Sequence, residues 1–294
     1  MSSFITGIAG GYQLGIRHGS ITGVSDSESP QKQQAHVLSA QIQPEKGYQI
    51  PAKYGTTGPQ LLKYGAIDYK KFEGVYAQAG KPLTDEQKTI LQKGSDQEVI
   101  FTAQNAYFLL NFFWALGLTN QNAILTEGPM MQNGREQAGS FASTGGWTIG
   151  VRTPMQLFAS TPILYLTSEQ QGRLKEVASA VYRPCCDNPT HFPDCNHGMA
   201  ILGLLELMAS QDATEDQMFE AAKHVNGFWY PQQTLEIATL FQTLQNVDFN
   251  HADARQVVSA KYSSGSGFQA VHRWLASNNL LEQAPDQGGS CGVQ

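Results

Sequence analysis

The thiol and imidazole side chains of this chain gather in one short segment, residues 182–199. The segment holds three of the four cysteines and two of the seven histidines, namely Cys185, Cys186, His191, Cys195 and His197. Thiolate sulfur and imidazole nitrogen are the ligands that zinc, copper and iron commonly take from proteins. We therefore expect the chemistry of the protein to reside in this segment.

These ligand types predict a site for a metal ion or a metal cofactor. The full set of candidate ligands is Cys185, Cys186, His191, Cys195, His197, Met199 and Cys291. Structural zinc sites normally use a C-x-x-C pair, whose spacing turns both sulfurs toward one ion, and the adjacent pair Cys185–Cys186 lacks that spacing. Sulfur combined with histidine also suits copper, which is softer than zinc. The expected cofactor is thus copper, zinc or iron, and its identity stays open.

The same cysteines allow two other interpretations. An even number of cysteines in an exported protein predicts two disulfides. Because adjacent cysteines rarely pair, Cys185 and Cys186 would be joined to Cys195 and Cys291, giving a disulfide-stapled binding or structural module without a metal. The third interpretation is a thiol-dependent oxidoreductase, in which Cys195 is a low-pKa nucleophile at a helix N-terminus. His197 would be its base, but His191 across the loop is better placed, because side chains two residues apart in a helix do not face each other.

Prolines predict the shape of the segment that carries these side chains. They are Pro184, Pro189 and Pro193. Proline fixes φ, lacks an amide donor and disfavours helix at the residue before it, so residues 185–195 are expected to form a rigid, non-helical loop. A helix should follow, with Asp194 or Asn196 as its N-cap. Its buried face is predicted to contain Ile201, Leu204, Leu205 and Met208. Cys195 would then lie at the positive end of a helix dipole, which favours the thiolate.

The rest of the chain predicts a mainly α fold, a globular multi-helix domain. Capping boxes are indicated by the pairs Thr84–Gln87, Ser95–Glu98, Ser168–Gln171 and Thr214–Gln217. Gly94 and Gly117 stand where helices should end, so one helix is expected over about residues 96–116. Because this helix is apolar all round, we predict that it is the central buried helix. Further helices are expected over residues 168–182, 196–210, 215–229, 231–246, 252–261 and 269–277.

The predicted organisation is one helical domain with an N-terminal extension. Residues 1–60 are rich in Gly, Ser and Gln and lack a helical apolar stripe, so we expect a long irregular, part-β arm packed on the core. Residues 61–294 form the helical domain, with the Cys/His loop at 182–199. Residues 120–161 should be a long connection held down by Trp147. A G-x-G-x-x-A match at residues 265–270 is rejected as a dinucleotide site, because too little chain follows it for a βαβ unit.

Composition and charge exclude several partners. Only 15% of the residues are charged, the net charge is -6, and Lys and Arg form no cluster, so nucleic acid is not an expected partner. The most apolar run, residues 106–118, is broken by Asn111 and is shorter than the about 20 residues that span a bilayer, which predicts a soluble protein without a membrane span. Low charge and clustered cysteines favour an extracytoplasmic location, periplasmic or secreted, with the signal peptide removed. No catalytic motif specifies an enzyme class, a protein partner or a small ligand.

Overall fold

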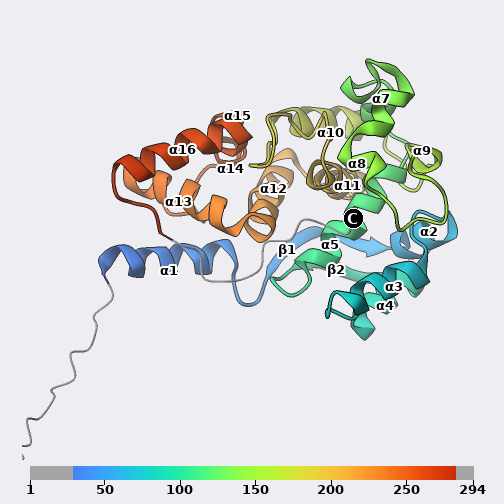
Figure 1. Ribbon diagram of the computed structural model, residues 1–294, viewed down its shortest axis with the longest axis horizontal. Helices are drawn as coiled ribbons and strands as arrows, with labels where there is room; N and C mark the ends of the chain where they lie inside the picture. The colour runs from blue at the N-terminus through green and yellow to red at the C-terminus, as the bar shows by residue number, and fades with distance from the viewer. Residues whose placement is uncertain (1–28, 283–294) are drawn as a thin grey trace, which may run out of the picture.

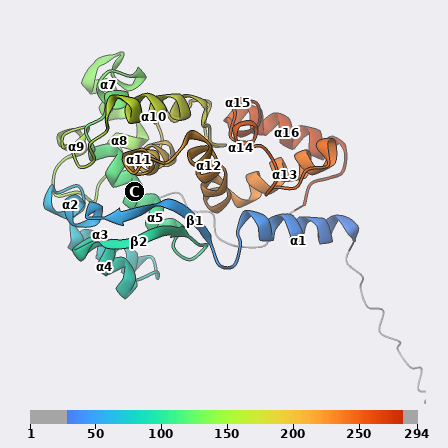
Figure 2. The same ribbon diagram turned by 180° about the vertical axis from the view of Figure 1, so that it is seen from behind.

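The computed structural model describes residues 29–282, which form a mainly helical structure with one two-stranded sheet (Figures 1 and 2). The predicted fold class is therefore confirmed at the level of helix content. In chain order the elements are α1 (Pro30–Ile42), β1 (Tyr48–Gly55), α2 (Thr57–Lys63), α3 (Tyr69–Gln78), α4 (Asp85–Lys93), β2 (Ser95–Phe101), α5 (Ala106–Thr119), α6 (Ala123–Thr126), the 3-10 helix η1 (Pro129–Met131), α7 (Gly134–Ser140), α8 (Ala142–Gly145), α9 (Pro154–Leu157), α10 (Ser168–Ala180), α11 (Asn196–Ser210), α12 (Glu215–Trp229), α13 (Pro231–Gln245), α14 (Ala254–Val257), α15 (Ala260–Ser263) and α16 (Gly265–Ser277).

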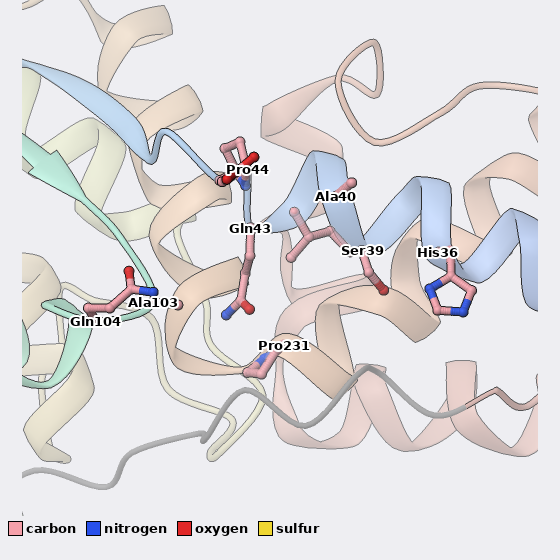
Figure 3. A pocket seen from close by; sticks show the side chains of 10 residues that line it. His36, Ser39, Ala40, Gln43, Pro44, Ala103, Gln104 and Pro231 are labelled. Atoms are coloured by element: carbon pink, nitrogen blue, oxygen red, sulfur yellow. The ribbon is translucent and has the colours of Figure 1, made fainter.

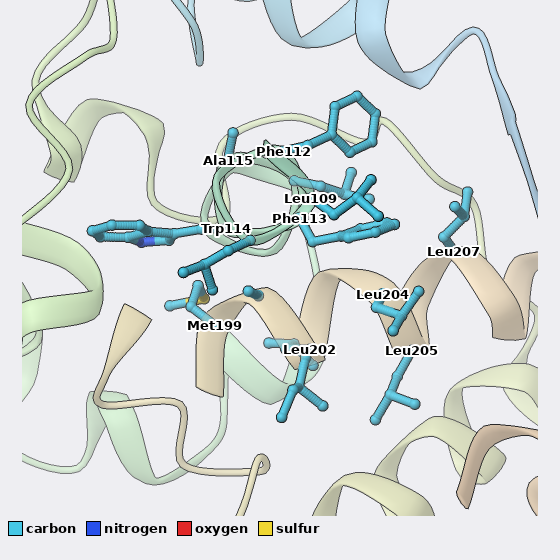
Figure 4. Close-up of a cluster of buried hydrophobic side chains, with 14 of the residues drawn as sticks. Leu109, Phe112, Phe113, Trp114, Ala115, Met199, Leu202, Leu204, Leu205 and Leu207 are labelled. Carbon is cyan, nitrogen blue, oxygen red and sulfur yellow. The ribbon is translucent and has the colours of Figure 1, made fainter. Parts of the chain in front are cut away.

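Helices α5 and α11 pack against each other at close range (Figure 4). Every residue of α5 except Tyr107 is buried, and α11 is buried from His197 to Ala209. A Cβ atom on Gly117 would collide with the carbonyl oxygen of Met199, and one on Gly203 would collide with that of Phe113. The two glycines therefore let the helix backbones touch, and this contact fixes the position of α11, the helix that begins at the cysteine loop.

The helix predicted over residues 96–116 is wrong in its first part. Residues 95–101 form strand β2, which pairs antiparallel with β1, and helix resumes only at Ala106. Val99 and Phe101 alternate with exposed residues and point into the core, which is the period of a strand. Gly94 does end a helix, α4, with φ +81°. Gly117 does not end one, because its lack of a side chain serves the crossing with α11.

The irregular arm predicted over residues 1–60 is also corrected in its described part. Residues 30–42 form α1, which starts at the N-cap Ser29 with Pro30 in its first turn. The buried residues Leu38 and Ile42 of α1 belong to a hydrophobic cluster that also includes residues of α13 and α16. Tyr48–Gly55 is the strand β1. Residues 1–28 of the arm lie outside the described residues.

Capping signals in the sequence predict where several helices begin, to within one residue. The boxes Thr84–Gln87 and Thr214–Gln217 are confirmed. The box of α10 is Thr167–Gln170, one residue before the predicted pair, and Ser95–Glu98 lies in a strand. Helices α12 and α13 follow the predicted bounds closely, and Pro231 opens α13 as expected.

The predicted long connection over residues 120–161 contains several short helices, η1 and α6 to α9. Trp147 holds it down as expected, because its ring is buried and its indole nitrogen donates to the carbonyl of Ala66 at 2.7 Å. None of the helices in residues 29–282 is long and apolar enough to cross a membrane.

Candidate metal centre

Three cysteine thiols converge in the loop between α10 and α11. The Sγ atoms of Cys185 and Cys195 lie 3.4 Å apart, those of Cys185 and Cys186 3.8 Å apart, and those of Cys186 and Cys195 3.9 Å apart. Cys185 is exposed and the other two are partly buried, so the cluster is open to solvent on one side. These three residues form a group that could hold a metal ion. We call it the thiol cluster.

The loop that carries the thiol cluster is non-helical, as its prolines predict. Its backbone is tied to the end of α10, because the amide of Thr190 donates to Val181 and the amide of His191 donates to Ala178. Thr190 also donates its hydroxyl to the Val181 carbonyl at 3.0 Å. These bonds fold the loop back on itself and bring Cys185 next to Cys195, ten residues later.

Cys195 itself caps α11, where Asp194 or Asn196 was expected. Its Sγ accepts a hydrogen bond from the backbone amide of Gly198 at 3.3 Å, and its extended backbone lies outside the helix. The prediction that Cys195 lies at a helix N-terminus is therefore confirmed in a stronger form, since the sulfur accepts one of the helix's free amides.

Arg183 is the buried cation of the site. Its side chain is fully buried; Nε donates to Cys195 Sγ at 3.1 Å, and Nη2 pairs with Asp194 Oδ1 at 2.7 Å. Nη1 donates to the carbonyl oxygen of Asn188 at 2.6 Å. A Cβ atom on Gly198 would lie 2.5 Å from the guanidinium, so only glycine leaves room for this group. The planar guanidinium of Arg183 thus binds three residues of the loop, and one of them is Cys195, whose sulfur accepts its hydrogen bond.

The start of α16 holds the other side of the loop. The Gly265 amide donates to the Cys186 carbonyl at 2.8 Å, and the Ser266 amide donates to the Asp187 carboxylate at 2.7 Å. The bond from Ser266 lowers the pKa of Asp187. The segment rejected as a dinucleotide site is therefore a helix start that supports the cysteine loop.

The thiols differ in how readily they ionise. Hydrogen bonds from Cys185 and Cys186, together with Arg183, hold the pKa of Cys195 well below its usual range despite burial. The contact with Cys186 lowers the pKa of Cys185, but the contact with Cys195 and burial outweigh it and raise this pKa to about 11. Contacts with both neighbours and burial raise the pKa of Cys186. The neighbouring thiols and the guanidinium of Arg183 thus favour the thiolate form of Cys195 over that of the other two cysteines.

Tyr230, between α12 and α13, lies next to the thiol cluster. Its hydroxyl is buried next to Cys185 but makes no well-formed hydrogen bond within the described residues. Burial raises the pKa of Tyr230, and the neighbouring Cys185 and Cys195 add to this effect. The Tyr230 ring contacts the ring of His197, with centroids 4.6 Å apart.

The structure places the remaining candidate ligands as follows. His197 is buried in the first turn of α11, where its ring contacts the rings of Trp229 and Tyr230. His191 is half-buried in the loop between Cys186 and Cys195. Neither histidine belongs to the group formed by the three cysteine sulfurs. Met199 is fully buried in the core beside α5 (Figure 4). Cys291 lies outside the described residues.

No disulfide joins the three described cysteines, so the disulfide interpretation is not supported among them. Their sulfurs are 3.4 Å or more apart, whereas a disulfide bond measures about 2.05 Å. Two ligands bound at about 2.3 Å to a tetrahedral zinc ion are about 3.8 Å apart. The observed spacings resemble the edges of such a site.

Sequence reasoning missed Arg183 and Tyr230 as parts of the site. Arg183 had one signal, since it stands directly before Pro184 and Cys185 and is the only Lys or Arg in residues 182–199. Tyr230 had none, because it is 45 residues from Cys185 and only the packing of α12 on the loop brings them together.

Comparison of the chain with protein-family models, with curated proteins and with solved structures gives no match.

Proposed function

We propose that this protein binds a thiophilic metal ion through the thiolates of Cys185, Cys186 and Cys195. The observation that carries the proposal is the convergence of the three sulfurs within 3.9 Å in a loop fixed by Arg183 and the start of α16. A set of ligands held in place before binding loses little conformational freedom when the metal arrives.

Charge supports a metal as the natural occupant. Three thiolates this close together repel one another, and the described residues around them supply one buried cation, Arg183, which is already paired with Asp194. A bound cation would offset the charge of Cys185 and Cys186. The exposed position of Cys185 gives an ion a way in.

The ligand chemistry limits the metal to a class. Thiolate sulfur selects zinc, cuprous copper and iron in iron–sulfur centres over magnesium or calcium. In the extracytoplasmic location favoured by the composition, a bound metal would also protect the thiols from oxidation. Metal binding at this loop is then the function of the protein, and the bundle of helices is its support.

The test measures metal content and its dependence on each thiol. Protein purified under reducing conditions is titrated with zinc and with cuprous copper, and bound metal is measured by mass spectrometry. We expect about one ion per chain, a lower melting temperature after chelation, and loss of metal in Cys185→Ser, Cys186→Ser and Cys195→Ser.

The matched control is His191→Gln, which changes a polar side chain of the same loop outside the thiol cluster. It should keep the metal. Wild-type protein that takes up neither ion, or cysteine variants that bind as well as wild type, would overturn the proposal.

A thiol–disulfide exchange centre is the second candidate, favoured by the low pKa of Cys195 and its 3.4 Å separation from Cys185. The Cys195 thiolate would attack a substrate disulfide and release one thiolate. Cys185 would then lose its proton to solvent and attack the sulfur of Cys195, which releases the second substrate thiolate and leaves a Cys185–Cys195 disulfide. Release of two thiolates from a small disulfide per molecule of reduced, metal-free protein, falling to one in Cys185→Ser, would favour this candidate.

A further inference from the structure

The hydroxyl of Tyr230 is an unpaired polar group beside the thiol cluster. The residue is 8% exposed, and its hydroxyl oxygen is buried without a hydrogen-bond partner within residues 29–282. The side chain that interacts most directly with this hydroxyl is the thiol of Cys185. A buried hydroxyl that stays unpaired is unfavourable, and native proteins keep few of them. The unpaired hydroxyl therefore indicates an acceptor that forms in another state of the site.

Three helices fix the position of this hydroxyl. Tyr230 stands where α12 ends and α13 begins, because its amide donates to the carbonyl of Asn226 at 2.7 Å and its carbonyl accepts from the amide of Thr234 at 2.9 Å. Its ring contacts the ring of His197 in the first turn of α11, with centroids 4.6 Å apart. The hydroxyl is therefore held beside the cluster before any metal arrives.

The junction of α12 and α13 is itself tied to its surroundings. Pro231, the first residue of α13, lines a cavity together with Gln43 of α1 (Figure 3). The side-chain amide of Gln43 donates to the carbonyl of Gly227 in α12 at 3.2 Å. Asn226 donates its side-chain amide to the carbonyl of Tyr182, just before the cysteine loop, at 3.0 Å. These bonds keep the hydroxyl and the loop in a fixed relative position.

Cys185 is the sulfur of the cluster that has no well-formed hydrogen bond to a group outside it, in the part of the chain that the structure describes. Cys195 Sγ accepts from Arg183 Nε at 3.1 Å and from a backbone amide of α11 at 3.3 Å. Cys186 Sγ donates to Asp194 Oδ1 at 3.7 Å. The hydrogen bonds of Cys185 reach only the other two sulfurs, and Cys185 is also the most exposed of the three.

Metal binding would supply the acceptor that the hydroxyl lacks. Cysteine binds zinc or copper as the thiolate, which carries no proton and accepts hydrogen bonds. A hydrogen bond to a charged acceptor is stronger than one between neutral groups. A hydroxyl hydrogen can also rotate toward the sulfur while the ring stays in place. The change of Cys185 from thiol to metal-bound thiolate thus gives the hydroxyl a partner.

We propose that Tyr230 donates a hydrogen bond from its hydroxyl to the Cys185 sulfur when a metal is bound there. The inference rests on the proposed metal-binding function and adds a positioning residue to it. Hydrogen bonds to ligand sulfurs draw electron density from them and tune the metal. Tyr230 therefore stabilises the metal-bound form and makes Cys185, the exposed ligand, a weaker nucleophile.

The experiment compares Tyr230→Phe with wild type, both as full-length, reduced protein. Zinc affinity is measured by competition with a chelator and should fall about 10- to 100-fold, as on the loss of other outer-sphere partners. The metal-free variant should melt no lower than wild type, because phenylalanine removes an unpaired buried hydroxyl. A lower affinity without a lower melting temperature separates a hydrogen bond to the ligand from a general loss of stability.

Cobalt reports on the sulfur directly. Co²⁺ binds the same kinds of site as zinc, and its thiolate complexes absorb light by transfer of an electron from sulfur to metal. A sulfur that has lost a hydrogen bond gives up this electron more easily, so the absorption band should move to lower energy in Tyr230→Phe. A substitution that only loosened the packing would leave the band in its wild-type position.

Tyr76→Phe is the matched control, because it removes a buried hydroxyl that is not bonded to a sulfur. The Tyr76 hydroxyl donates to the carbonyl of Tyr107 at 3.2 Å and accepts from Asn111 Nδ2 at 2.8 Å. Both bonds are lost in the variant, so it should melt lower than wild type. It should still bind zinc with wild-type affinity and leave the cobalt band unmoved.

The outcomes separate the two proposals. Wild-type zinc affinity in Tyr230→Phe, or a lower affinity with the cobalt band unmoved, overturns the role of Tyr230 and leaves the metal site standing. An equal loss of affinity in Tyr76→Phe overturns that role too, because any lost hydroxyl would then have the same effect. Wild-type protein that binds neither zinc nor cobalt overturns both the hydrogen bond and the metal function.

Discussion

Replacing Arg183 by Met should destabilise the metal-free protein strongly. Arg183 is fully buried and donates to Cys195, Asn188 and Asp194 at 3.1, 2.6 and 2.7 Å. Methionine has nearly the same length but removes every one of these donors. The change therefore separates the polar contacts of the guanidinium from the volume that it fills.

The magnitude follows from what the substitution leaves behind. Removing one partner of a buried ion pair costs about 3 to 5 kcal/mol, because the other charge stays buried without compensation. Asp194 keeps a hydrogen bond from Asn188 at 2.7 Å and its side chain is 19% exposed. We therefore expect a loss near the lower end, about 3 kcal/mol. Arg183→Lys keeps the charge but not the fork, and should lose less, about 1 to 3 kcal/mol.

The assay is urea unfolding of reduced protein in the presence of a chelator. A double-mutant cycle with Asp194→Asn isolates the ion pair, and the expected coupling is about 1.5 to 3 kcal/mol. Gly198→Ala is a milder perturbation at the same place, since its methyl group would displace the guanidinium. The reasoning is refuted if Arg183→Met unfolds within about 0.5 kcal/mol of wild type, the range of ordinary surface substitutions.

Three further predictions concern the frame of the site. Gly203→Ala should lower the free energy of unfolding by at least about 1 to 3 kcal/mol, because the added methyl group collides with α5. Gly172→Ala in α10, where the added methyl group meets no atom within 4 Å, should raise it by about 0.4 to 1 kcal/mol. Denaturant midpoints of the two variants give the comparison. Burial lowers the pKa of His224 to about 3. The free energy of unfolding that the neutral imidazole contributes is therefore complete above about pH 6.5 and falls by up to about 1.4 kcal/mol per pH unit as the pH drops toward 3. His224→Phe should flatten this slope when unfolding is measured across that range. Burial raises the pKa of Glu206 well above 4.5, so its contribution is complete below about pH 4.5 and is lost as the pH rises; Glu206→Gln should gain stability over wild type from pH 5 to 8, and equal pH profiles would contradict this.

Local signals were enough to predict the elements that frame the site. The non-helical loop over residues 185–195 follows from its prolines, and the bounds of α12 and α13 follow from Thr214 and Pro231. Each of these features depends on residues that are close together in the sequence. These features can therefore be predicted from the local sequence alone.

Features that depend on distant partners were missed. Residues 95–101 look helical in isolation, but they form β2 because Tyr48 and Lys53 of β1 pair with Phe101 and Glu98. Gly117 suggests a helix end until α11 is packed on it. The guanidinium of Arg183 gains its role from Cys195 and Asp194, which a fold of the loop brings to it. Such contacts have no local pattern from which they could be predicted.

The bonds from Gly265 and Ser266 to the cysteine loop have a consequence for how the protein unfolds. The residues of α5 and α11 belong to one hydrophobic cluster, while those of α1, α13 and α16 belong to another. The loop is attached to both, through Cys195 at the start of α11 and through Cys186 and Asp187 at the start of α16. An ion shared by Cys186 and Cys195 would fix the loop that both clusters hold, with a metal–sulfur bond at the start of α11 and the hydrogen bonds from Gly265 and Ser266 at the start of α16. Bound metal should therefore raise the cooperativity of unfolding across the two clusters.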